Sequence, residues 1–423
     1  MNGEPIDLAI IGAGPAGLSL GALLRGKPDQ KRLGARFQIF DRKQSFSWHA
    51  DQDFAHSKML SSVLRDLVTP VEPTNEFSFL QFLHQNGRLA AFMNRGVMLP
   101  SRSEFAEYLS WCAGQLKEVS WSSEVSSLSI TSDGNFWRIG IKDCLTEETS
   151  STLARHAVLC TGWTPNTSDI EYPDCQQVFH SSKFWTRYSG IPQGSRVAVI
   201  GAGQTAAEII LHLLGDKRRI AEVLWFDSNP SPRLLNLNHF VKEYFTHEYG
   251  QTFWGRSSEA RAKVLAKDRS VSHGISGAMF AAIYERLYRN TYHDGGPRLR
   301  TRFLTQVTRI AQENNALTIA SQSSDANKCD IVDAVVIATG FRNEHTLLDQ
   351  VAISGRHRLN FDCSVSTGKD HKAKLFVLNA NFDEFGLGDG ALSTIPGRAA
   401  AVLNAMDLGF RIEATPQELL VDW

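Results

Sequence analysis

The sequence predicts an α/β fold with two Rossmann-like dinucleotide-binding domains and a smaller, discontinuous substrate-binding region. The first observation is a repeated unit: an apolar strand at residues 6–11 passes through a glycine-rich turn into a helix, and the same pattern returns from Arg196. The second is a pair of apolar strands that end in Thr-Gly, at 161–162 and 339–340, each after one of these units. A chain that crosses repeatedly between two nucleotide-binding domains would show this order.

The first glycine-rich turn has the residues that a dinucleotide pyrophosphate requires. Gly12 permits the tight turn, Gly14 lets the backbone approach the pyrophosphate, and Gly17 lets the helix pack closely on the strand. The helix begins near Pro15, and its N-terminus is an anion-binding site. The next strand ends in Asp41, about 20 residues further on, where an acid binds a ribose hydroxyl. These residues predict a nucleotide site.

The second unit predicts another site, of the G-x-G-x-x-A type. Gly201 and Gly203 form the turn, Gln204 and Thr205 follow, and Ala206 replaces the third glycine. Two such sites in one chain are typical of a protein that binds FAD in one and a nicotinamide dinucleotide in the other, so that hydride passes between them.

The residue after the second nucleotide strand bears on which nicotinamide cofactor is used. That strand ends in Asp227, and no arginine occurs between it and Arg233. An acid suits the free 2′-hydroxyl of NADH, whereas the 2′-phosphate of NADPH favours arginine. NADPH and NADH both stay open as the reductant.

Composition excludes several classes of function. The chain has 423 residues, enough for two or three domains, and 44 basic against 45 acidic residues give a net charge of −1. Nucleic acid and anionic membranes are therefore not expected partners, and a small molecule is. The six cysteines form no Cys-x-x-Cys pair, so neither a disulfide framework nor a metal site is expected. No basic leader or membrane-length apolar run occurs, which predicts a soluble, cytoplasmic protein.

These signals divide the chain into segments. We expect the FAD domain in 1–165 and 346–423, the nicotinamide domain from 166–235, a helical substrate-binding segment at 236–300, and a return to the nucleotide-binding domains at 301–345. The elements expected within them are helices near 77–83, 105–111 and 277–289, a hairpin at 133–134, strands that resume near 303, a strand at 375–379, and a turn at 386–391 into a helix.

Several further motifs are specific when they occur together. They are Phe46 to His49, Leu64 to Val68, Pro73 to Asn75, Phe77 to Phe79, Arg102 to Trp111, Glu243 to Phe245 and Ala338 to Phe341. With the two turns, they give nearly the whole chain a resemblance to the flavin-dependent N-hydroxylating monooxygenases, the lysine and ornithine N-monooxygenases of hydroxamate siderophore pathways. The resemblance implies non-covalent FAD, a nicotinamide reductant, and O₂ added at the flavin C4a, whose distal oxygen passes to an unprotonated primary amine.

The turns and the resemblance together give the candidate cofactor-binding residues. They are Gly12, Gly14, Pro15, Gly17, Asp41, Trp48, His49, Arg102, Thr161, Gly162, Gly201, Gly203, Gln204, Thr205, Ala206, Asp227, Thr339, Gly340, Gly388 and Ser393. The chemistry is centred on the flavin, so the resemblance names no catalytic side chain.

The chain departs from the family at two positions near the flavin. Gly17 stands where the family usually has asparagine, and Leu60 where a glutamine is common. Neither change should abolish FAD binding. The basic residues that usually follow the second nucleotide strand are also missing, which counts against the family's usual NADPH.

The departures are larger among the candidate substrate residues. The lysine that holds the substrate carboxylate in ornithine enzymes falls at Arg65, and an asparagine falls at Lys242. Either cation can hold an anionic end of the substrate, or be solvated or paired with Asp66 and Glu243. His273 and Ser393 are further candidates, and a structural role for His273 is the alternative.

Two other functions stay open at this point. A Baeyer–Villiger or S-oxygenating monooxygenase shares the two turns but needs no amine pocket. A non-catalytic flavoprotein that serves as a binding partner would explain the altered pocket residues. Members of the resembling family are often dimers or tetramers, and the sequence itself does not indicate whether a homo-oligomer forms.

Overall fold

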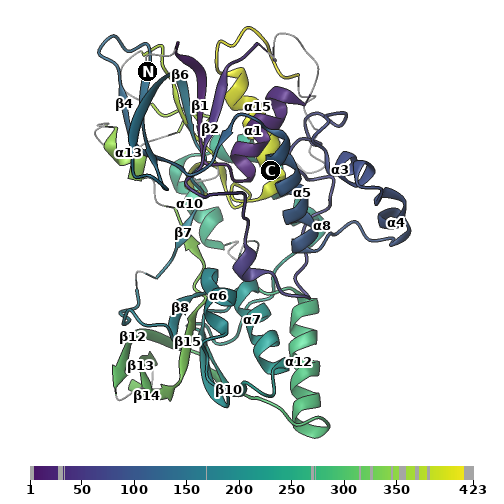
Figure 1. Ribbon diagram of the computed structural model, residues 1–423. Coiled ribbons are helices and arrows are strands. Elements are labelled where there is room, and N and C mark those ends of the chain that lie inside the picture. The colour runs from purple at the N-terminus through teal and green to yellow at the C-terminus, as the bar shows by residue number, and fades with distance from the viewer. Residues whose placement is uncertain are drawn as a thin grey trace.

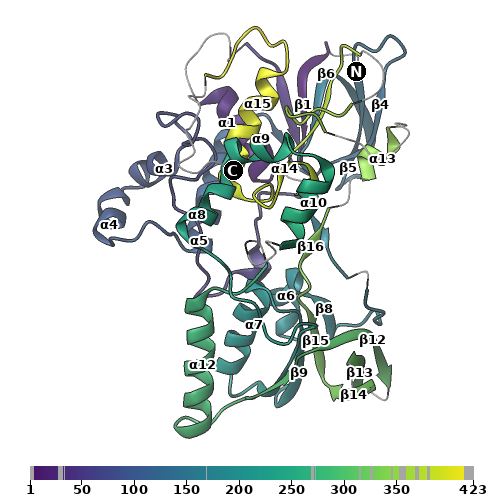
Figure 2. The same cartoon turned by 180° about the vertical axis from the view of Figure 1, so that it is seen from behind.

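The computed structural model describes residues 4–26, 32, 34–167, 169–267, 271, 273–313, 316–323, 327–343, 346–351, 359–366, 371–378 and 382–413. These residues form two α/β lobes stacked end to end, with the N-terminal strand in one lobe and the long helix α12 (Gly277–Tyr292) in the other (Figures 1 and 2). The predicted α/β class is confirmed.

A seven-stranded sheet forms the core of the first lobe. Its strands are β1 (Ile6–Ile11), β2 (Phe37–Phe40), β3 (Val119–Ser120), β4 (Ser123–Ile130), β5 (Trp137–Asp143), β6 (Thr149–Leu159) and β17 (Leu375–Val377). The order is β3-β2-β1-β6-β5-β4, and β17 also pairs with β6. Helices α1 (Pro15–Arg25) and α15 (Ile395–Asn404) pack against each other. The C-terminal part of the chain therefore returns to the first glycine-rich unit.

The second lobe has three layers. A parallel sheet in the order β11-β10-β9-β15-β8 is formed by β8 (Val178–His180), β9 (Ser195–Ile200), β10 (Ile220–Phe226), β11 (Arg298–Arg302) and β15 (Ala334–Ile337). Helices α7 (Gln204–Gly215) and α12 share a core with one face. The antiparallel strands β12 (Thr305–Glu313), β13 (Ala316–Ser323) and β14 (Asn327–Val332) cover the other. Burial on both faces explains the apolar central strands.

The chain passes between the lobes just after each of the two Thr-Gly dipeptides. Strand β7 (Thr164–Pro165) leaves the first lobe and β16 (Phe341–Arg342) returns to it, and the two pair as an antiparallel ribbon. The backbone N–H of Asn166 donates to the Gly340 carbonyl over 3.0 Å. The two connecting segments are therefore joined by backbone hydrogen bonds.

The remaining helices complete both lobes. They are α3 (Phe79–Gln85), α4 (Leu89–Asn94), α5 (Arg102–Gln115), α6 (Phe184–Tyr188), α8 (His239–Lys242), α9 (His247–Trp254), α10 (Ser258–Lys267), α13 (Thr346–Gln350) and α14 (Phe382–Phe385), with the 3₁₀ turns η1 (Ala50–Gln52), η2 (Ser181–Lys183), η3 (Glu243–Phe245) and η4 (Leu392–Thr394). Serine hydroxyls cap α3 and α5, as Ser78 accepts from the N–H of Gln81 and Ser101 from that of Glu104. The three predicted helices and the hairpin at 133–134 are confirmed.

Two strands have boundaries that differ from the predicted ones. Strands resume at Arg298 and not near 303, because the edge strand β11 has arginine at alternate positions and lacks an apolar run. The strand expected at 375–379 ends at Val377, and Asn379 lies outside the described residues.

Within the described residues, no helix has the length and apolar character that crossing a bilayer requires. The same residues contain no group of three or more His, Cys, Asp or Glu side chains placed to hold a metal ion. All six cysteines are free thiols.

A buried histidine in the first lobe makes stability depend on pH. His156 lies on β6 with 5% of its surface exposed, its Nδ1 accepts from the Lys374 N–H over 3.2 Å, and its Nε2 has no hydrogen-bond partner in the described structure. Burial, helped by Arg155 and Lys374, lowers the pKa of His156 from 6.5 to about 4. The folded protein therefore disfavours the protonated ring. We expect the free energy of unfolding to fall as pH drops from 6.5 towards 4, by up to roughly 3 kcal/mol from this residue.

Urea unfolding at a series of pH values measures this effect. A His156→Asn variant keeps an acceptor for the Lys374 N–H but cannot be protonated, so its stability should vary less with pH over this interval. The control, the exposed His293→Asn, should keep the wild-type slope. Equal slopes for His156→Asn and wild type would contradict the assignment.

Candidate active site

The first glycine-rich turn leaves one side open for a ligand. Gly12 has φ +110°, and a Cβ there would lie 2.3 Å from the Cys160 carbonyl oxygen. A Cβ on Gly17 would lie 1.9 Å from the Gly12 carbonyl oxygen, whereas one on Gly14 would meet no atom of the described residues within 4 Å. Gly14 is the residue before Pro15, the first residue of α1, where backbone N–H groups lack partners within the helix. The turn fits a pyrophosphate that approaches the backbone at Gly14.

Asp41 braces this turn from the end of β2. It is 8% exposed, its Oδ2 accepts from the Ala13 N–H over 2.8 Å, and its Oδ1 accepts from the Lys43 N–H over 2.9 Å. Each carboxylate oxygen has a second lone pair, so both retain the capacity to accept from a ribose hydroxyl. The residues of the first turn therefore fit FAD.

The second turn repeats this geometry in the other lobe. Gly201 has φ +124°, and a Cβ there would lie 2.3 Å from the Ala338 carbonyl oxygen, while Gly203 again faces open space. Thr205 is partly buried and Ala206 is fully buried, so a small residue is needed there for helix packing. The Gln204 side chain instead accepts from the Ser276 N–H over 3.0 Å, which ties α7 to the start of α12. The second turn fits the pyrophosphate of a nicotinamide dinucleotide.

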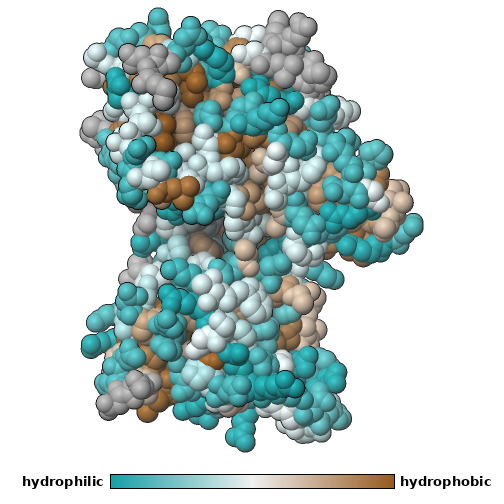
Figure 3. Space-filling model, viewed as in Figure 1, coloured by the Kyte–Doolittle hydropathy of each residue, from teal (hydrophilic) through white to brown (hydrophobic). Residues whose placement is uncertain are grey.

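Other candidate cofactor residues gather where the lobes meet. Trp48 packs edge-on against His49 with ring centroids 4.7 Å apart, and His49 also contacts Phe341 of the returning crossing. Thr161 and Gly162 precede the first crossing; Thr339 and Gly340 precede the second, with the Thr339 hydroxyl donating to the Asn166 carbonyl. The space-filling view narrows at this junction (Figure 3).

Arg102 joins the lobes. Its guanidinium makes two hydrogen bonds to the carboxylate of Glu208, at 2.9 and 3.2 Å, and it also donates to the Gln52 carbonyl and the Ser57 hydroxyl. Glu208, on α7, is fully buried and accepts from Gln204 as well. The sequence placed Arg102 near a cofactor and did not indicate Glu208, because the two lie 106 positions apart.

A second contact reinforces this junction. Phe54, in the segment that follows η1, is 2% exposed and packs in the core of the second lobe. On either side of it, the Asp51 carboxylate accepts from the Thr186 N–H over 2.7 Å, and the Asp53 carbonyl accepts from the Trp185 ring N–H over 3.0 Å. Residues 51–54 are therefore anchored in the other lobe, which fixes how the two nucleotide turns face each other.

Three segments far apart in sequence form the candidate substrate site. The Ser393 hydroxyl donates to the Phe245 carbonyl over 2.8 Å, and a Cβ on Gly388 would lie 2.1 Å from the Tyr244 carbonyl oxygen. The turn before α15 therefore lies directly against η3. Glu243, in η3, acts electrostatically on Arg65, which adds the third segment. Helix α8 lies beside α5 in both ribbon views (Figures 1 and 2).

Arg65 is a partly buried cation without a fixed partner among the described residues. Burial lowers its pKa from the ordinary value, and the charge of Glu243 partly offsets this. Asp66 does not neutralise it: the Asp66 carboxylate is 1% exposed and accepts from the N–H groups of Val68, Thr69 and Phe79. No ion pair joins Arg65 and Asp66 among the described residues, whereas Glu243, the other acid of that alternative, acts on Arg65 through its charge.

The other candidate substrate residues differ in position. Lys242 is exposed at the end of α8, next to Glu243. His273 is exposed in the loop before α12, where the following Ile275 exchanges backbone hydrogen bonds with Arg233 and Leu235 beyond β10. The loop that carries His273 is therefore tied to the segment after β10, and Val271, two residues before His273, packs with Tyr244 and Phe245 of η3.

Sequence reasoning missed a buried ion pair below the substrate turn. Arg398 on α15 is 3% exposed, pairs with Asp389 in the turn after Gly388, and lies 4.2 Å above the Phe385 ring. Burial lowers the pKa of Arg398 to about 10. The signal in the sequence was an arginine on an otherwise apolar helix face, because a buried arginine requires a partner. The pair holds the turn against α15.

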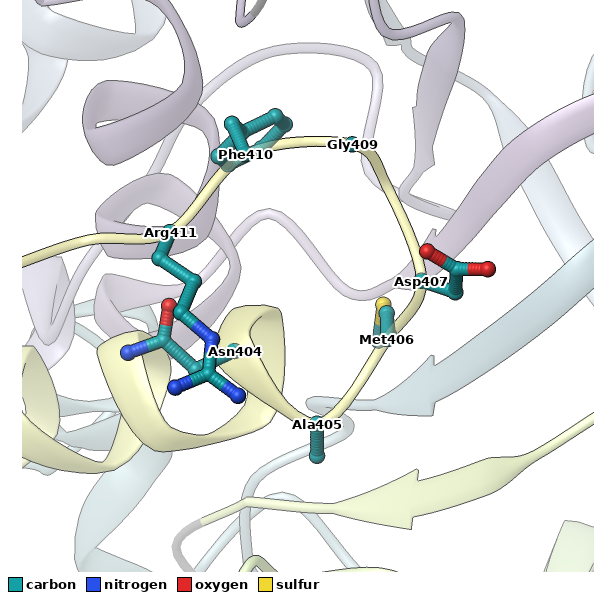
Figure 4. A pocket seen from close by; sticks show the side chains of 7 residues that line it. All are labelled: Asn404, Ala405, Met406, Asp407, Gly409, Phe410 and Arg411. Atoms are coloured by element: carbon teal, nitrogen blue, oxygen red, sulfur yellow. The ribbon is translucent and has the colours of Figure 1, made fainter.

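A separate pocket of about 550 Å³ lies at the far end of α15. Figure 4 shows its lining residues, which all come from one short stretch of the chain: Asn404, Ala405, Met406, Asp407, Gly409, Phe410 and Arg411. Ser393 lies at the opposite end of the helix, so this pocket is not part of the candidate site.

Comparisons with known proteins agree with this arrangement. The sequence model of the L-lysine 6-monooxygenase/L-ornithine 5-monooxygenase family matches residues 4–343. The L-ornithine N(5)-monooxygenase of Schizosaccharomyces pombe is 26% identical over 418 residues, which cover 94% of this chain and 95% of that protein. The putrescine N-hydroxylase of Shewanella oneidensis is 27% identical over 416 residues, which cover 96% of this chain and 81% of that protein.

A solved structure shares the whole fold. The ornithine N-hydroxylase of Kutzneria sp. 744, solved with reduced FAD, NADP⁺ and L-ornithine, superposes with a TM-score of 0.86 at 26% identity. The match covers 95% of this chain and 98% of that one, so both lobes and the crossings between them correspond.

Proposed function

Because the chain belongs to the L-lysine 6-monooxygenase/L-ornithine 5-monooxygenase family and is a flavin-dependent N-hydroxylating monooxygenase, we propose that its substrate is a diamino acid whose carboxylate binds Arg65. The family includes enzymes for amino acids and for diamines, since one relative hydroxylates ornithine and another putrescine. The proposal concerns which of these classes this enzyme uses.

The cofactors supply the oxidising chemistry and the protein supplies the arrangement. When bound, FAD reduced by the nicotinamide cofactor activates O₂ and provides one oxygen atom for a neutral primary amine. The two glycine-rich turns hold the dinucleotides on facing lobes, and the contacts of Arg102 and Phe54 set the distance between them. The role of Arg65 is to bind the end of the substrate opposite to the reacting amine, so that this amine lies at the flavin.

The single observation that carries the proposal is the state of Arg65. A partly buried guanidinium without a fixed partner in the described structure is costly unless a ligand provides an anion. A carboxylate accepts two parallel hydrogen bonds from a guanidinium, which makes it the best match. Putrescine and cadaverine have no carboxylate and would leave Arg65 with the charge of Glu243 but without a hydrogen-bonded anion among the described residues.

Glu243 extends the match to the α-ammonium group. The structure holds a cation and an anion near each other, at Arg65 and Glu243. An α-amino acid presents the complementary pair on one carbon, so its carboxylate takes Arg65 and its α-ammonium takes Glu243. The exposed Lys242, next to Glu243 in the chain, adds positive charge beside that carboxylate.

Replacing Arg65 by glutamine is expected to change substrate choice. Wild type should hydroxylate L-ornithine or L-lysine with a higher kcat/KM than putrescine or cadaverine. In Arg65→Gln, KM for the amino acids should rise by about 10- to 100-fold, the value of a charge-assisted hydrogen bond, with a smaller change in kcat. KM for the diamines should stay unchanged or fall. Hydroxylamine product and H₂O₂ release are measured together for each substrate.

Two controls make the result specific. Arg65→Lys keeps the charge and should recover part of the lost affinity, while Arg88→Gln removes an exposed arginine of the first lobe and should leave all four KM values unchanged. A wild-type preference for diamines, or an equal loss for all four substrates in Arg65→Gln, would refute the proposal.

We further propose a cytoplasmic enzyme that provides hydroxylated amines for siderophore or specialised-metabolite biosynthesis. Its cofactors and amino-acid substrate are cytoplasmic metabolites, and the net charge of −1 gives no field for nucleic acid or membrane surfaces. Cell fractionation with an antibody to the chain tests the location, and light scattering of the purified protein tests whether it forms a homo-oligomer.

A further inference from the structure

The two nucleotide strands each end in an aspartate, but the two carboxylates are used differently. In the first lobe, Asp41 accepts from the N–H of Ala13, inside its own glycine-rich turn. In the second, Asp227 accepts with Oδ1 only, from the N–H and side-chain amide of Asn229 at 3.0 and 2.9 Å. Asp227 is 5% exposed, and its Oδ2 has no hydrogen-bond partner in the described part of the structure.

The position of this unpartnered oxygen is fixed by the sheet. Asp227 follows β10, and the carbonyl of Phe226, one residue earlier, accepts from the N–H of Gly201 over 3.0 Å. On the other side, the Asp227 N–H donates to the Arg302 carbonyl over 3.1 Å. Asp227 therefore stands next to the second glycine-rich turn, where the adenosine ribose of a bound dinucleotide lies in this fold. A buried carboxylate oxygen without a partner is costly, and ribose hydroxyls are donors that can satisfy it.

The arginines near Asp227 are already engaged. Arg302 makes two hydrogen bonds to the Asp330 carboxylate, at 3.0 and 2.6 Å, and Arg300 pairs with Glu222 over 3.0 Å. Arg233 donates to the Asn229 side chain over 2.8 Å. Arg302 and Arg300 are thus neutralised by carboxylates, whereas the partner of Arg233 is a neutral amide. A 2′-phosphate would meet the negative charge of Asp227, which Arg233 alone of these three arginines could oppose.

We propose that Asp227 selects NADH over NADPH, by accepting hydrogen bonds from the 2′- and 3′-hydroxyls of the adenosine ribose with Oδ2 and by repelling a 2′-phosphate. The inference rests on the proposed function only in that a nicotinamide dinucleotide reduces the flavin. It sets this enzyme apart from the Kutzneria relative, which was solved with NADP⁺.

Titration calorimetry on the FAD-loaded enzyme tests the proposal without any amine. Wild type should bind NAD⁺ at least about tenfold more tightly than NADP⁺. Asp227→Ser should weaken NAD⁺ binding by about tenfold and strengthen NADP⁺ binding, so that the ratio approaches or passes one. Ser228→Arg adds a cation at an exposed position beside Asp227 and should strengthen NADP⁺ binding alone. The exposed Asp174→Asn, in the same lobe, is the control and should keep the wild-type ratio.

Anaerobic flavin reduction, measured with NADH and with NADPH, is a second measurement of the preference between the two cofactors. Tighter binding of NADP⁺ by wild type would overturn the proposal. A wild-type preference for NAD⁺ that Asp227→Ser leaves unchanged would overturn the role of Asp227, and Ser228→Arg decides the matter if Asp227→Ser does not fold. Since no step uses an amine, the absence of hydroxylated product would refute the proposed substrate and leave this result intact.

Discussion

A Gly12→Ala variant is expected to contain no FAD after purification and to unfold at lower denaturant concentration than the wild-type apoprotein. Gly12 has φ +110°, which strains any other residue, and its Cβ would lie 2.3 Å from the Cys160 carbonyl oxygen at the end of β6. Neither backbone can yield without separating β1 from β6, which pair from Ile6 to Ile11. The ratio of flavin to protein absorbance and a urea titration measure the two effects.

A Gly14→Ala variant tests a glycine that FAD binding requires but folding does not. A Cβ at Gly14 meets no atom within 4 Å in the part of the chain that the structure describes, so the apoprotein should be as stable as wild type. The methyl group would, however, occupy the space through which a pyrophosphate approaches the backbone. We expect the Kd for FAD to rise by at least about 100-fold, measured by quenching of flavin fluorescence.

Gly114→Ala is the matched control for both variants. Gly114 lies within α5 and a Cβ there also meets no atom within 4 Å, so this change should leave FAD binding unchanged and stabilise the helix by up to about 1 kcal/mol. Wild-type FAD affinity in Gly14→Ala would show that the first turn is not the pyrophosphate site.

The parts of the site that the sequence predicts are those encoded within one short segment. Gly12, Gly14 and Gly17 are informative because a turn between strand and helix imposes its own backbone geometry, wherever the rest of the chain lies. Gly201 and Asp41 are also informative from the sequence alone, because each directly follows an apolar strand. The fold followed from two such units, since a pair of dinucleotide turns on one chain permits few architectures.

The parts that the sequence does not predict depend on contacts between distant segments. Glu208 looks like any polar residue of an amphipathic helix, and only the folded structure brings Arg102 to it. The absence of an ion pair between Arg65 and Asp66 in the described structure is likewise a matter of folding, because the Asp66 carboxylate accepts from backbone N–H groups as far along the chain as Phe79. Neighbours in sequence suggested an ion pair there, and the strong local hydrogen bonds of Asp66 prevented it.

Removing one side of the ion pair between Arg102 and Glu208 is expected to cause a large loss of stability. The two side chains are 15% and 0% exposed, and among the described residues the Glu208 carboxylate retains only the Gln204 amide if the guanidinium is removed. Arg102→Ala leaves a buried carboxylate without its cation, which is expected to destabilise the protein by about 3–5 kcal/mol. Arg88→Ala breaks a pair with Glu107 whose side chains are 40% and 57% exposed, and it should cost less than about 1 kcal/mol. Thermal unfolding of the two variants compares them directly.

A double variant distinguishes a role in stability from a role in positioning. Arg102→Met combined with Glu208→Met removes both charges, so most of the lost stability should return. The pair also joins the two lobes, and an error of about 1 Å in the placement of reacting groups can slow a reaction by about 100-fold. The double variant should therefore fold well and yet transfer hydride from the nicotinamide to the flavin more slowly than wild type, as measured by anaerobic stopped flow. Wild-type reduction rates in a stable double variant would show that Phe54 and the β7–β16 ribbon suffice to hold the lobes, with Arg102 serving stability alone.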